Sequence, residues 1–400
     1  MTLEIEDITD SLANRRSDMR FRAHVDYDGH EKVIYAEDND IGFRAFIAVH
    51  NNARGPALGG CRYWSRYGSD EEAISDVLRL SRGMTYKNSV AGLALGGGKS
   101  VIIGKPGTRQ PSAEIMQALG SAVNSLGGLY VTAEDVGTSV QHILIARGRT
   151  PYVAGVPLTA LCEEHVPVGL ENAAVPNADP SPYTAYGTYM AVKAAVRHRL
   201  KVDSLRGLTI TVKGYGHVAQ VLCRYLVDDG AKLIVSDITD HARRQVIADF
   251  GPEVLLAEGR EIMSVASDVY VPCAMGGDIN DGTIPHLVLA GVKVVAGCAN
   301  NQLKSPHHAD ELRRAGILYA PDYVANAGGV IAAGMQYLWM VKPEQSAFPT
   351  HNTISDRVAQ IGVVLEQIFA RADAEGKNTA VVADEQGREG FTQRLQKQAA

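Results

Sequence analysis

The sequence has few of the residues and spacings that mark disulfide-rich or metal-binding proteins. Its 400 residues include five cysteines, which are scattered, odd in number and never arranged as Cys-x-x-Cys. With no histidine spacing typical of a zinc site, this pattern predicts a reduced protein that binds no metal. Cys162 and His165 could share a metal ion, but a buried thiol beside a loop histidine is the favoured interpretation.

Long apolar runs and blocks of positive charge are also lacking. No stretch is long and apolar enough to span a bilayer, and the acidic N-terminal segment has no apolar region typical of a signal peptide. The 39 basic and 45 acidic residues give a net charge of −6 without any basic block. This balance argues against nucleic acid or an anionic membrane as a partner. We therefore expect a cytoplasmic protein, and the length predicts two domains.

A glycine-rich stretch at residues 92–100 reads Gly-Leu-Ala-Leu-Gly-Gly-Gly-Lys-Ser. Three consecutive glycines leave the backbone bare, so we expect a turn that another group can approach closely, with Lys99 at its end. A phosphate-binding loop does not fit, because Leu93 occupies the place of that motif's first glycine. Lys87 precedes this stretch and Asp135 follows it, each near a glycine. Two lysines and a carboxylate suggest a site for an anionic substrate and for proton transfer.

The first part of the chain alternates between strand and helix patterns, which predicts an α/β domain. Ser69 and Glu72 form a capping box that starts a helix, and Gly83 either ends this helix or marks close packing within it. Residues 55–60, rich in glycine, are expected to form a turn. Apolar and β-branched runs predict strands at residues 33–35, 43–49, 100–103 and 129–132, and helical spacing predicts a helix at 113–123.

The second part carries the pattern of a dinucleotide-binding domain. A predicted strand at 208–212 runs into Gly214-x-Gly216-x-x-Ala219, and a predicted helix follows. Asp237 comes about 20 residues later, after the next predicted strand, where a partner for a ribose hydroxyl belongs. Further strands are expected at 268–271, 292–296 and 317–319. Asn300 and Asn326 follow two of them, and turn formation or a role in binding explains each asparagine equally well.

At this point the sequence resembles a known family, the amino-acid dehydrogenases that include the glutamate, leucine, phenylalanine and valine enzymes, and within them the leucine enzymes most. The resemblance lies in residues 55–62, 83–104, 130–139, 181–187, 214–219, 299–303 and 321–331. It implies an α/β fold of two domains with a cleft between them. Residues 1–150, joined by C-terminal helices at about 345–400, would bind substrate and form a homo-oligomer, a dimer or higher. Residues 151–344, including the proline-rich connection at 151–182, would form a Rossmann domain that binds NAD.

The resemblance also implies roles for individual residues. Lys99 would be the catalytic base and Asp135 its proton-transfer partner. Lys87, helped by Asn326, would bind the substrate α-carboxylate, and Asn300 would receive the amino group near the nicotinamide. The remaining substrate-binding residues would be Leu58, Gly59, Gly60, Met84, Ala133, Val330 and Ala333. The cofactor-binding residues would be Thr184, Gly214, Gly216, His217, Val218, Ala219, Asp237, Ala274 and Asn300.

The implied reaction is the reversible, NAD-dependent oxidative deamination of an apolar L-amino acid to the 2-oxo acid and ammonia. The glutamate enzymes have a lysine just before the Gly-Gly pair, where this sequence has Leu58, so an apolar substrate is expected. Branched aliphatic amino acids are favoured, with phenylalanine or another aromatic amino acid as the alternative. An amino-acid sensor without turnover is a more distant alternative. A 2-hydroxy-acid dehydrogenase is disfavoured, because that chemistry usually employs a histidine base.

Overall fold

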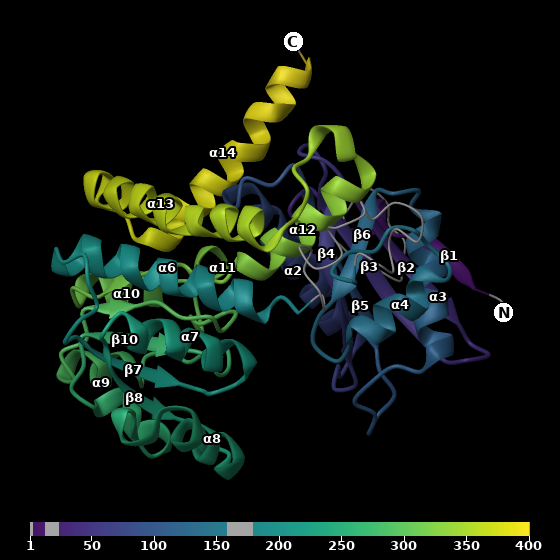
Figure 1. Ribbon diagram of the computed structural model, residues 1–400. Helices are drawn as coiled ribbons and strands as arrows, with labels where there is room; N and C mark the ends of the chain where they lie inside the picture. Colours follow the sequence, from purple (N-terminus) through teal and green to yellow (C-terminus); the bar gives the residue numbers. More distant parts are fainter. Residues whose placement is uncertain (1–2, 13–23, 158–178, 400) are drawn as a thin grey trace. The chain divides into compact units, whose positions relative to one another are not determined.

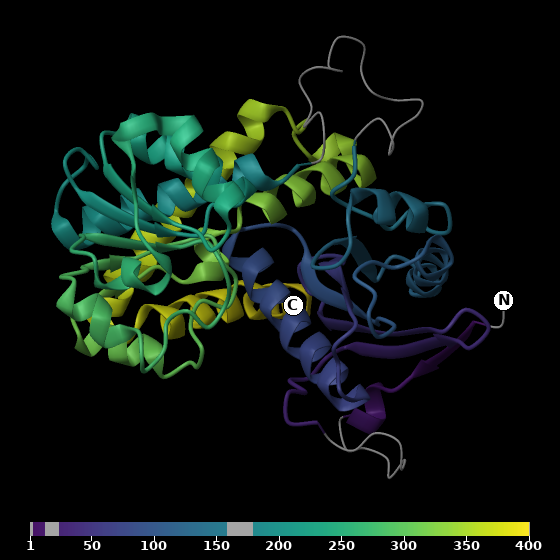
Figure 2. The ribbon, with the colours of Figure 1, turned by 90° about the horizontal axis from the view of Figure 1, so that it is seen from below.

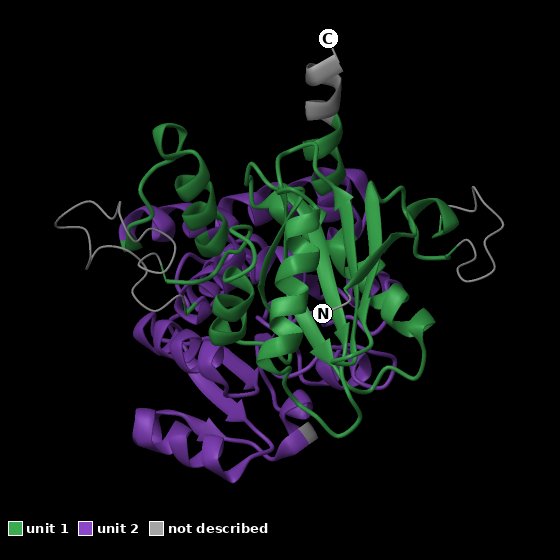
Figure 3. Ribbon diagram, turned by 90° about the vertical axis from the view of Figure 1, so that its right-hand side faces the viewer, with its two compact units in different colours: residues 1–179, 332–351, 387–400 green, residues 180–331, 352–386 purple. Residues whose placement is uncertain are grey.

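The computed structural model divides the chain into two compact units, each formed from more than one segment (Figures 1 and 3). Unit 1 comprises residues 1–179, 332–351 and 387–400, and unit 2 comprises residues 180–331 and 352–386. The structure describes residues 3–12, 24–157 and 179–399. Cys162, His165 and most of the expected connection between the domains therefore lie outside the described residues.

Unit 1 is built on a mixed sheet of six strands in the order β1-β2-β3-β5-β4-β6. β1, β2, β3 and β5 pair antiparallel, whereas β4 pairs parallel with both β5 and β6. The strands are β1 (Glu4–Asp7), β2 (Lys32–Asp38), β3 (Phe43–Asn51), β4 (Ala57–Trp64), β5 (Gly96–Ile103) and β6 (Tyr130–Glu134). The helices that accompany them are α1 (Thr9–Leu12), α2 (Asp70–Val90), α3 (Ala113–Ser125) and α4 (Val140–Arg147).

Helices cover both faces of this sheet, because successive strand residues point to opposite sides. On β2, Val33 and Tyr35 pack with the apolar stripe of α2, which includes Ile74 and Leu78. The alternate β2 residues belong to a second core with α3 and α4. Figure 2 shows α2 running along the sheet as a single long helix. This three-layer arrangement fixes the central strands β4 and β5, which carry the residues of interest.

Each glycine-rich stretch of unit 1 runs mainly as a strand, so the turns expected at 55–60 and 92–100 are wrong for all but the first residues of each. Residues from Ala57 onward belong to β4, and the three consecutive glycines begin β5. A Cβ at Gly97 would overlap the backbone of Thr85 on α2, and one at Gly98 would lie 2.6 Å from the Tyr130 ring. The bare backbone therefore admits neighbouring parts of unit 1 itself. α2 also continues through Gly83 to Val90, so Lys87 lies on a helix.

Unit 2 contains a fully parallel sheet of six strands in the order β12-β11-β10-β7-β8-β9. This is the strand order of a Rossmann fold, with the order reversing between β7 and β10. The predicted two-domain α/β fold is thus confirmed. The strands are β7 (Thr209–Lys213), β8 (Lys232–Ser236), β9 (Leu255–Leu256), β10 (Val269–Pro272), β11 (Val294–Val295) and β12 (Leu318–Tyr319). The helices between them are α7 (His217–Asp228), α8 (Asp240–Phe250), α9 (Ile284–Leu289) and α10 (His308–Arg314).

Five further helices precede and follow this sheet in the chain. They are α6 (Ser181–Leu200), α11 (Asp322–Ala325), α12 (Gly328–Val341), α13 (His351–Glu375) and α14 (Thr379–Ala399). In unit 2, α13 packs closely on α6, where a Cβ at Gly187 would lie 2.6 Å from Ile361. The end of the chain belongs to unit 1, where Ser89 Oγ donates to the Gly387 carbonyl at 2.7 Å. Within the described residues, the structure contains no helix suited to crossing a membrane.

Candidate active site

Lys99 and Asp135 form an ion pair in unit 1, with 2.8 Å between Lys99 Nζ and Asp135 Oδ2. Lys99 lies on β5 and Asp135 directly follows β6, and the sheet order places β4 between these two strands. The pair can form across β4 because that strand carries Gly60 at this point. A Cβ at Gly60 would lie 2.8 Å from Asp135 Cβ and 2.6 Å from the Glu134 carbonyl oxygen. The Gly-Gly pair therefore brings a buried amine and a carboxylate together.

The carboxylate of Asp135 is held in its ionised form. Burial by itself would raise its pKa, but the positive charges of Lys99 and Arg62 outweigh burial and lower the pKa to about 2. Arg62 Nε lies 3.2 Å from Asp135 Oδ2, and the backbone N–H of Asp135 donates to Thr138 Oγ1. Lys99 itself is 4 % exposed. A lysine shielded from water beside a fixed carboxylate is suited to proton transfer.

Arg62 also contacts Asp135, and the sequence analysis did not name it. Besides Asp135 it contacts Asp76, with 2.9 Å between Arg62 Nη1 and Asp76 Oδ2, and Tyr67 donates its hydroxyl to the same Asp76 oxygen. The strand register indicates that Arg62 lies near Asp135, because β4 pairs parallel with β6 and Cys61 lies opposite Glu134. The next residue of each strand would then be Arg62 and Asp135. Interpreting residues 55–60 as a turn concealed this pairing.

The other predicted substrate-binding residues of unit 1 lie on β4, β6, α2 and α12. Leu58 is 1 % exposed on β4, and Asn88 of α2 donates its side-chain amide to the Leu58 carbonyl. Ala133 and Ala333 both approach Gly155, whose Cβ would lie 3.9 and 3.8 Å from their methyl groups. The remaining residues are Gly59 on β4 and the half-buried Met84 and Lys87 on α2. Unit 1 therefore combines these apolar groups with two lysines.

Unit 2 carries the predicted dinucleotide-binding turn between β7 and α7. Gly214 has a φ of +99°, and its Cβ would lie 2.8 Å from the Ala274 nitrogen, so only glycine suits this position. Gly216 precedes α7, and a Cβ there would meet nothing within 4 Å. The first turn of α7 contains the predicted residues His217, Val218 and Ala219. Bare backbone at the N-terminus of a helix fits a pyrophosphate group.

Asp237 closes this turn at the end of β8. Its Oδ2 accepts from the Tyr215 N–H at 2.8 Å, and its Oδ1 accepts from the Thr239 N–H at 2.8 Å. Burial opposes ionisation, but these backbone hydrogen bonds lower the pKa of Asp237. The residue is therefore a carboxylate at neutral pH, placed next to the glycine turn. This arrangement fits an acceptor for ribose hydroxyls.

The two predicted asparagines of unit 2 lie together. Asn326 donates its side-chain amide to Asn300 Oδ1 at 2.7 Å and to the Cys298 carbonyl at 3.2 Å. Asn326 is 4 % exposed, whereas Asn300 is exposed. Asn326 thus orients the Asn300 amide group. Turn formation alone does not explain this side-chain hydrogen bond between the two asparagines. Of the other predicted residues in unit 2, Thr184 lies on α6 and Val330 on α12.

Two parts of the chain match families of known proteins. Residues 30–152 match the family described as Glu/Leu/Phe/Val dehydrogenase, dimerisation domain. Residues 237–386 match the family described as Glutamate/Leucine/Phenylalanine/Valine dehydrogenase. The first match covers the strands that carry Lys99 and Asp135, and the second begins at Asp237.

Similar proteins span nearly the whole chain. Leucine dehydrogenase from Geobacillus stearothermophilus is 42% identical over 369 residues, covering 92% of each chain. Valine dehydrogenase from Streptomyces albus is 40% identical, covering 90% of this chain and 92% of its own. Among solved structures, L-tryptophan dehydrogenase from Nostoc punctiforme matches with a TM-score of 0.74 and 33% identity, over 92% of this chain and 97% of that one.

Proposed function

Because the chain belongs to the Glu/Leu/Phe/Val dehydrogenase family and is an amino-acid dehydrogenase, we propose that it deaminates branched-chain L-amino acids oxidatively, with NAD as the oxidant. The products are the 2-oxo acid and ammonia, and the reaction is reversible. The observation that carries the proposal is the ion pair between the buried Lys99 and the partly buried Asp135, which supplies the proton chemistry of deamination. In this proposal unit 1 binds the amino acid and forms a homo-oligomer, and unit 2 binds the cofactor.

The residues of unit 2 fit NAD. The backbone at Gly214 and Gly216 and the first turn of α7 would hold the pyrophosphate, and Asp237 would accept from the ribose hydroxyls. Thr184, Ala274 and Asn300 are the further residues that we assign to the cofactor. Bound NAD would supply the hydride acceptor for the substrate Cα. No arginine adjoins Asp237 in sequence, so a 2′-phosphate would meet a carboxylate without a cation, which favours NAD over NADP.

The residues of unit 1 would orient the amino acid and move protons. Lys87 binds the α-carboxylate by a charge-assisted hydrogen bond. Lys99, as the neutral amine, takes a proton from the water that attacks the substrate imine, and the Asp135 carboxylate stabilises the ammonium that forms. Lys99 then gives this proton to the amino group as ammonia leaves, with Asp135 as its partner in the transfer. Asn326 fixes the amide of Asn300 so that its oxygen can accept from the substrate amino group.

The choice of side chain rests on Leu58. This residue is buried, and a substrate carboxylate placed against it would lose its hydration without gaining a cation. The other assigned pocket residues, Met84, Ala133, Val330 and Ala333, are apolar too. The similarity to leucine and valine dehydrogenases favours branched aliphatic substrates. An aromatic amino acid is the second candidate, because Ala133 and Ala333 are small and a tryptophan dehydrogenase has a similar structure.

A substrate panel tests this proposal. We expect NADH formation at alkaline pH to give the highest kcat/KM with leucine, valine or isoleucine, and values lower by orders of magnitude with glutamate. Phenylalanine and tryptophan as the best substrates would support the aromatic candidate. Glutamate as the best substrate would contradict the argument from Leu58. A chain that binds amino acids but forms no NADH would contradict the proposed reaction.

A further inference from the structure

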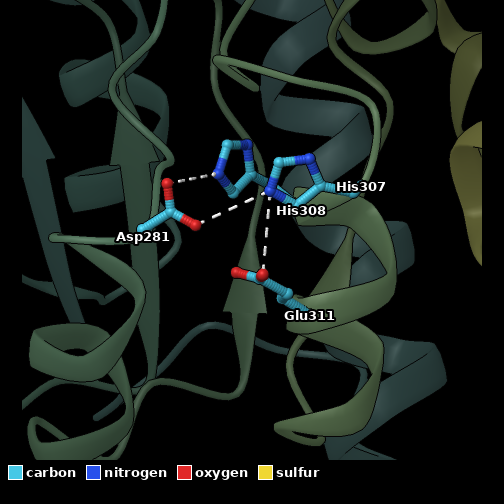
Figure 4. A group of neighbouring side chains, drawn as sticks. All are labelled: Asp281, His307, His308 and Glu311. Carbon is cyan, nitrogen blue, oxygen red and sulfur yellow. Dashed lines mark ion pairs between the residues drawn. The ribbon is translucent and has the colours of Figure 1, made fainter.

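Four side chains able to bind a metal ion converge in unit 2, and the proposed reaction uses none of them. Asp281 lies in the loop between β10 and α9, His307 precedes α10, and His308 and Glu311 lie on it (Figure 4). Their candidate ligand atoms all lie within 4.8 Å of one another. Among the residues that the structure describes, these are the only ones that form such a group.

The shortest separations in this group are close to those of a metal centre. His308 Nε2 lies 3.5 Å from Asp281 Oδ2, and His307 Nε2 lies 3.6 Å from Asp281 Oδ1. His307 Nε2 also lies 3.7 Å from Glu311 Oε1. Ligand atoms around a tetrahedral zinc ion lie roughly 3.3 Å apart, given metal–ligand distances of about 2.0–2.1 Å. Small side-chain rotations would therefore bring these atoms into one coordination sphere.

His308 supplies an independent observation. Its side chain is 1 % exposed, yet Nε2 has no hydrogen-bond partner among the described residues. The Ser305 N–H donates to its other ring nitrogen, Nδ1, at 3.0 Å, and Nδ1 also lies 3.0 Å from the Ser305 carbonyl oxygen. The tautomer that donates Nδ1–H to this carbonyl, in place of accepting from the Ser305 N–H, leaves the Nε2 lone pair available to a metal ion. Histidines that bind metals usually donate their second ring N–H in this way.

The backbone holds the two segments of the group in place. Ile279 donates its N–H to the Gln302 carbonyl at 2.9 Å, and Lys304 donates to the Ile279 carbonyl at 2.9 Å. The loop that carries Asp281 therefore pairs with the segment that leads into α10. Within that segment, His307 and Glu311 are four residues apart and face one another at the start of the helix. A metal ion would not have to assemble the site from separate parts.

We propose that Asp281, His307, His308 and Glu311 bind one divalent transition-metal ion of the zinc type. Two imidazoles with two carboxylates suit Zn²⁺, Co²⁺ or Ni²⁺, whereas Ca²⁺ and Mg²⁺ prefer shells of oxygen alone. The ion would fasten the loop after β10 to α10 and so stabilise unit 2. This proposal departs from the metal-free protein expected from the sequence. Asp281 lies far before the histidines in the chain, so only the fold reveals the complete set.

Titration of the untagged, chelator-treated chain with ZnCl₂ tests this proposal. We expect one ion per chain by calorimetry, a Tm higher by several degrees, and no such shift with MgCl₂ or CaCl₂. With CoCl₂ we expect the intense visible absorption of four-coordinate cobalt. Binding of much less than one ion per chain would overturn the proposal, and so would the weak visible absorption of six-coordinate cobalt.

Variants locate the ion. The double variant His307→Ala/Glu311→Gln and the single variant Asp281→Asn should each weaken zinc binding at least tenfold and remove the Tm shift. All three residues are at least partly exposed, so we expect both variants to fold, which circular dichroism checks. His241→Ala, at an exposed histidine of the same unit, should bind zinc as the unaltered chain does. Unchanged affinity in both site variants would show that the ion binds elsewhere and would refute the assignment.

Discussion

Lys99 and Arg62 donate to the same oxygen atom, Oδ2 of Asp135, from distances of 2.8 and 3.2 Å. The two cations differ in chemistry, because lysine can exchange its proton whereas arginine stays charged at any working pH. Arg62 therefore keeps Asp135 ionised while Lys99 cycles between its two forms. A second carboxylate, Asp76, fixes Arg62 in this position.

The two lysines of unit 1 should respond differently to removal. We expect Lys99→Ala to lose at least a thousandfold in kcat, because the variant lacks the amine that contacts Asp135. Lys87→Ala should mainly raise the KM for the amino acid, because it loses a charge-assisted contact. Steady-state kinetics measures both, and Lys105→Ala, at an exposed lysine, is the matched control. Near-normal turnover in Lys99→Ala would disprove its role as the base.

Replacing Arg62 should alter the pH dependence of turnover. Without this charge the pKa of Asp135 rises from about 2, so the acidic limb of the kcat profile of Arg62→Gln should move to higher pH. We expect kcat to fall by about ten- to a hundredfold, in the range typical of proton-transfer defects. Arg44→Gln removes an arginine of β3 that pairs with Asp70 at the start of α2, and it should leave the profile unchanged. An unshifted acidic limb in Arg62→Gln would count against its positioning role.

Two glycine-to-alanine changes in unit 1 should differ in their effects: one should lower kcat, and the other should raise the stability of the fold. In Gly60→Ala the new methyl group would lie 2.8 Å from Asp135 Cβ, so Asp135 must move away and kcat should fall at least tenfold. In Gly83→Ala the methyl group meets nothing within 4 Å on an exposed turn of α2, so the helix should gain about 0.5–1 kcal/mol. Kinetics and thermal melts of both variants test this contrast. A fully active Gly60→Ala would show that the contact across β4 is unimportant.

The cofactor preference should depend on Asp237. We expect the unaltered chain to have a much higher kcat/KM with NAD⁺ than with NADP⁺, and Asp237→Asn to reduce this ratio at least tenfold by removing the negative charge. Asp240→Asn, at an exposed acid nearby, controls for a general change in charge. Because Asp237 also accepts two backbone hydrogen bonds, melts must show that the turn persists. A preference for NADP⁺ in the unaltered chain would rule out the role assigned to Asp237.

Two buried histidines of unit 1 should make the fold sensitive to mild acid. Burial is the largest cause that lowers the pKa of His30 and His50 to about 4, from 6.5 for an exposed histidine, and their rings lie 4.8 Å apart. The unfolded chain therefore binds more protons between pH 6.5 and about 4. As the pH is lowered from 6.5 to about 4, the free energy of unfolding should therefore decrease, by up to about 1.4 kcal/mol per pH unit for each histidine. Above pH 6.5 both groups are neutral in either state and this dependence disappears.

Thermal melts between pH 7.5 and pH 4.5 measure this effect. His30→Gln should flatten the dependence, because glutamine does not titrate in this range. His241→Gln, at an exposed position, should keep it. Equal slopes in both variants would assign the acid sensitivity to other groups.

Unit 2 was the easier half to predict, because its signals are local. Its buried parallel strands are short apolar runs, and Gly214, Gly216 and Asp237 follow them at fixed spacings. Unit 1 was harder, because glycine within a strand looks like a turn. Position 97 must be glycine because Thr85 packs against it, and position 98 because the Tyr130 ring does. No local sequence pattern shows that these distant residues will pack there.

The same limit applies to the candidate site. Lys99, Asp135 and Asn326 carried enough motif information to be proposed, whereas the hydrogen bond between Asn326 and Asn300 and the contact of Arg62 with Asp135 exist only after the strands pair. The four proposed metal ligands are a further case. Their spacing in the chain matches no compact motif, and their proximity arises from the pairing of two loops.

The return of the C-terminal segment to unit 1 has a consequence for synthesis in the cell. The hydrogen-bond partner of Ser89, the Gly387 carbonyl, is synthesised 298 residues after it. The partner of Arg54, the Gly390 carbonyl, is synthesised 336 residues after it. At roughly 5–20 residues per second, the ribosome needs about 15 to 60 seconds to supply the Gly387 carbonyl. During this interval, in which all of unit 2 is made, the end of α2 lacks this contact and is open to chaperones and proteases. Ribosomes that stop before Gly387 would thus release chains whose first unit lacks its last segment, and these are the natural targets of degradation.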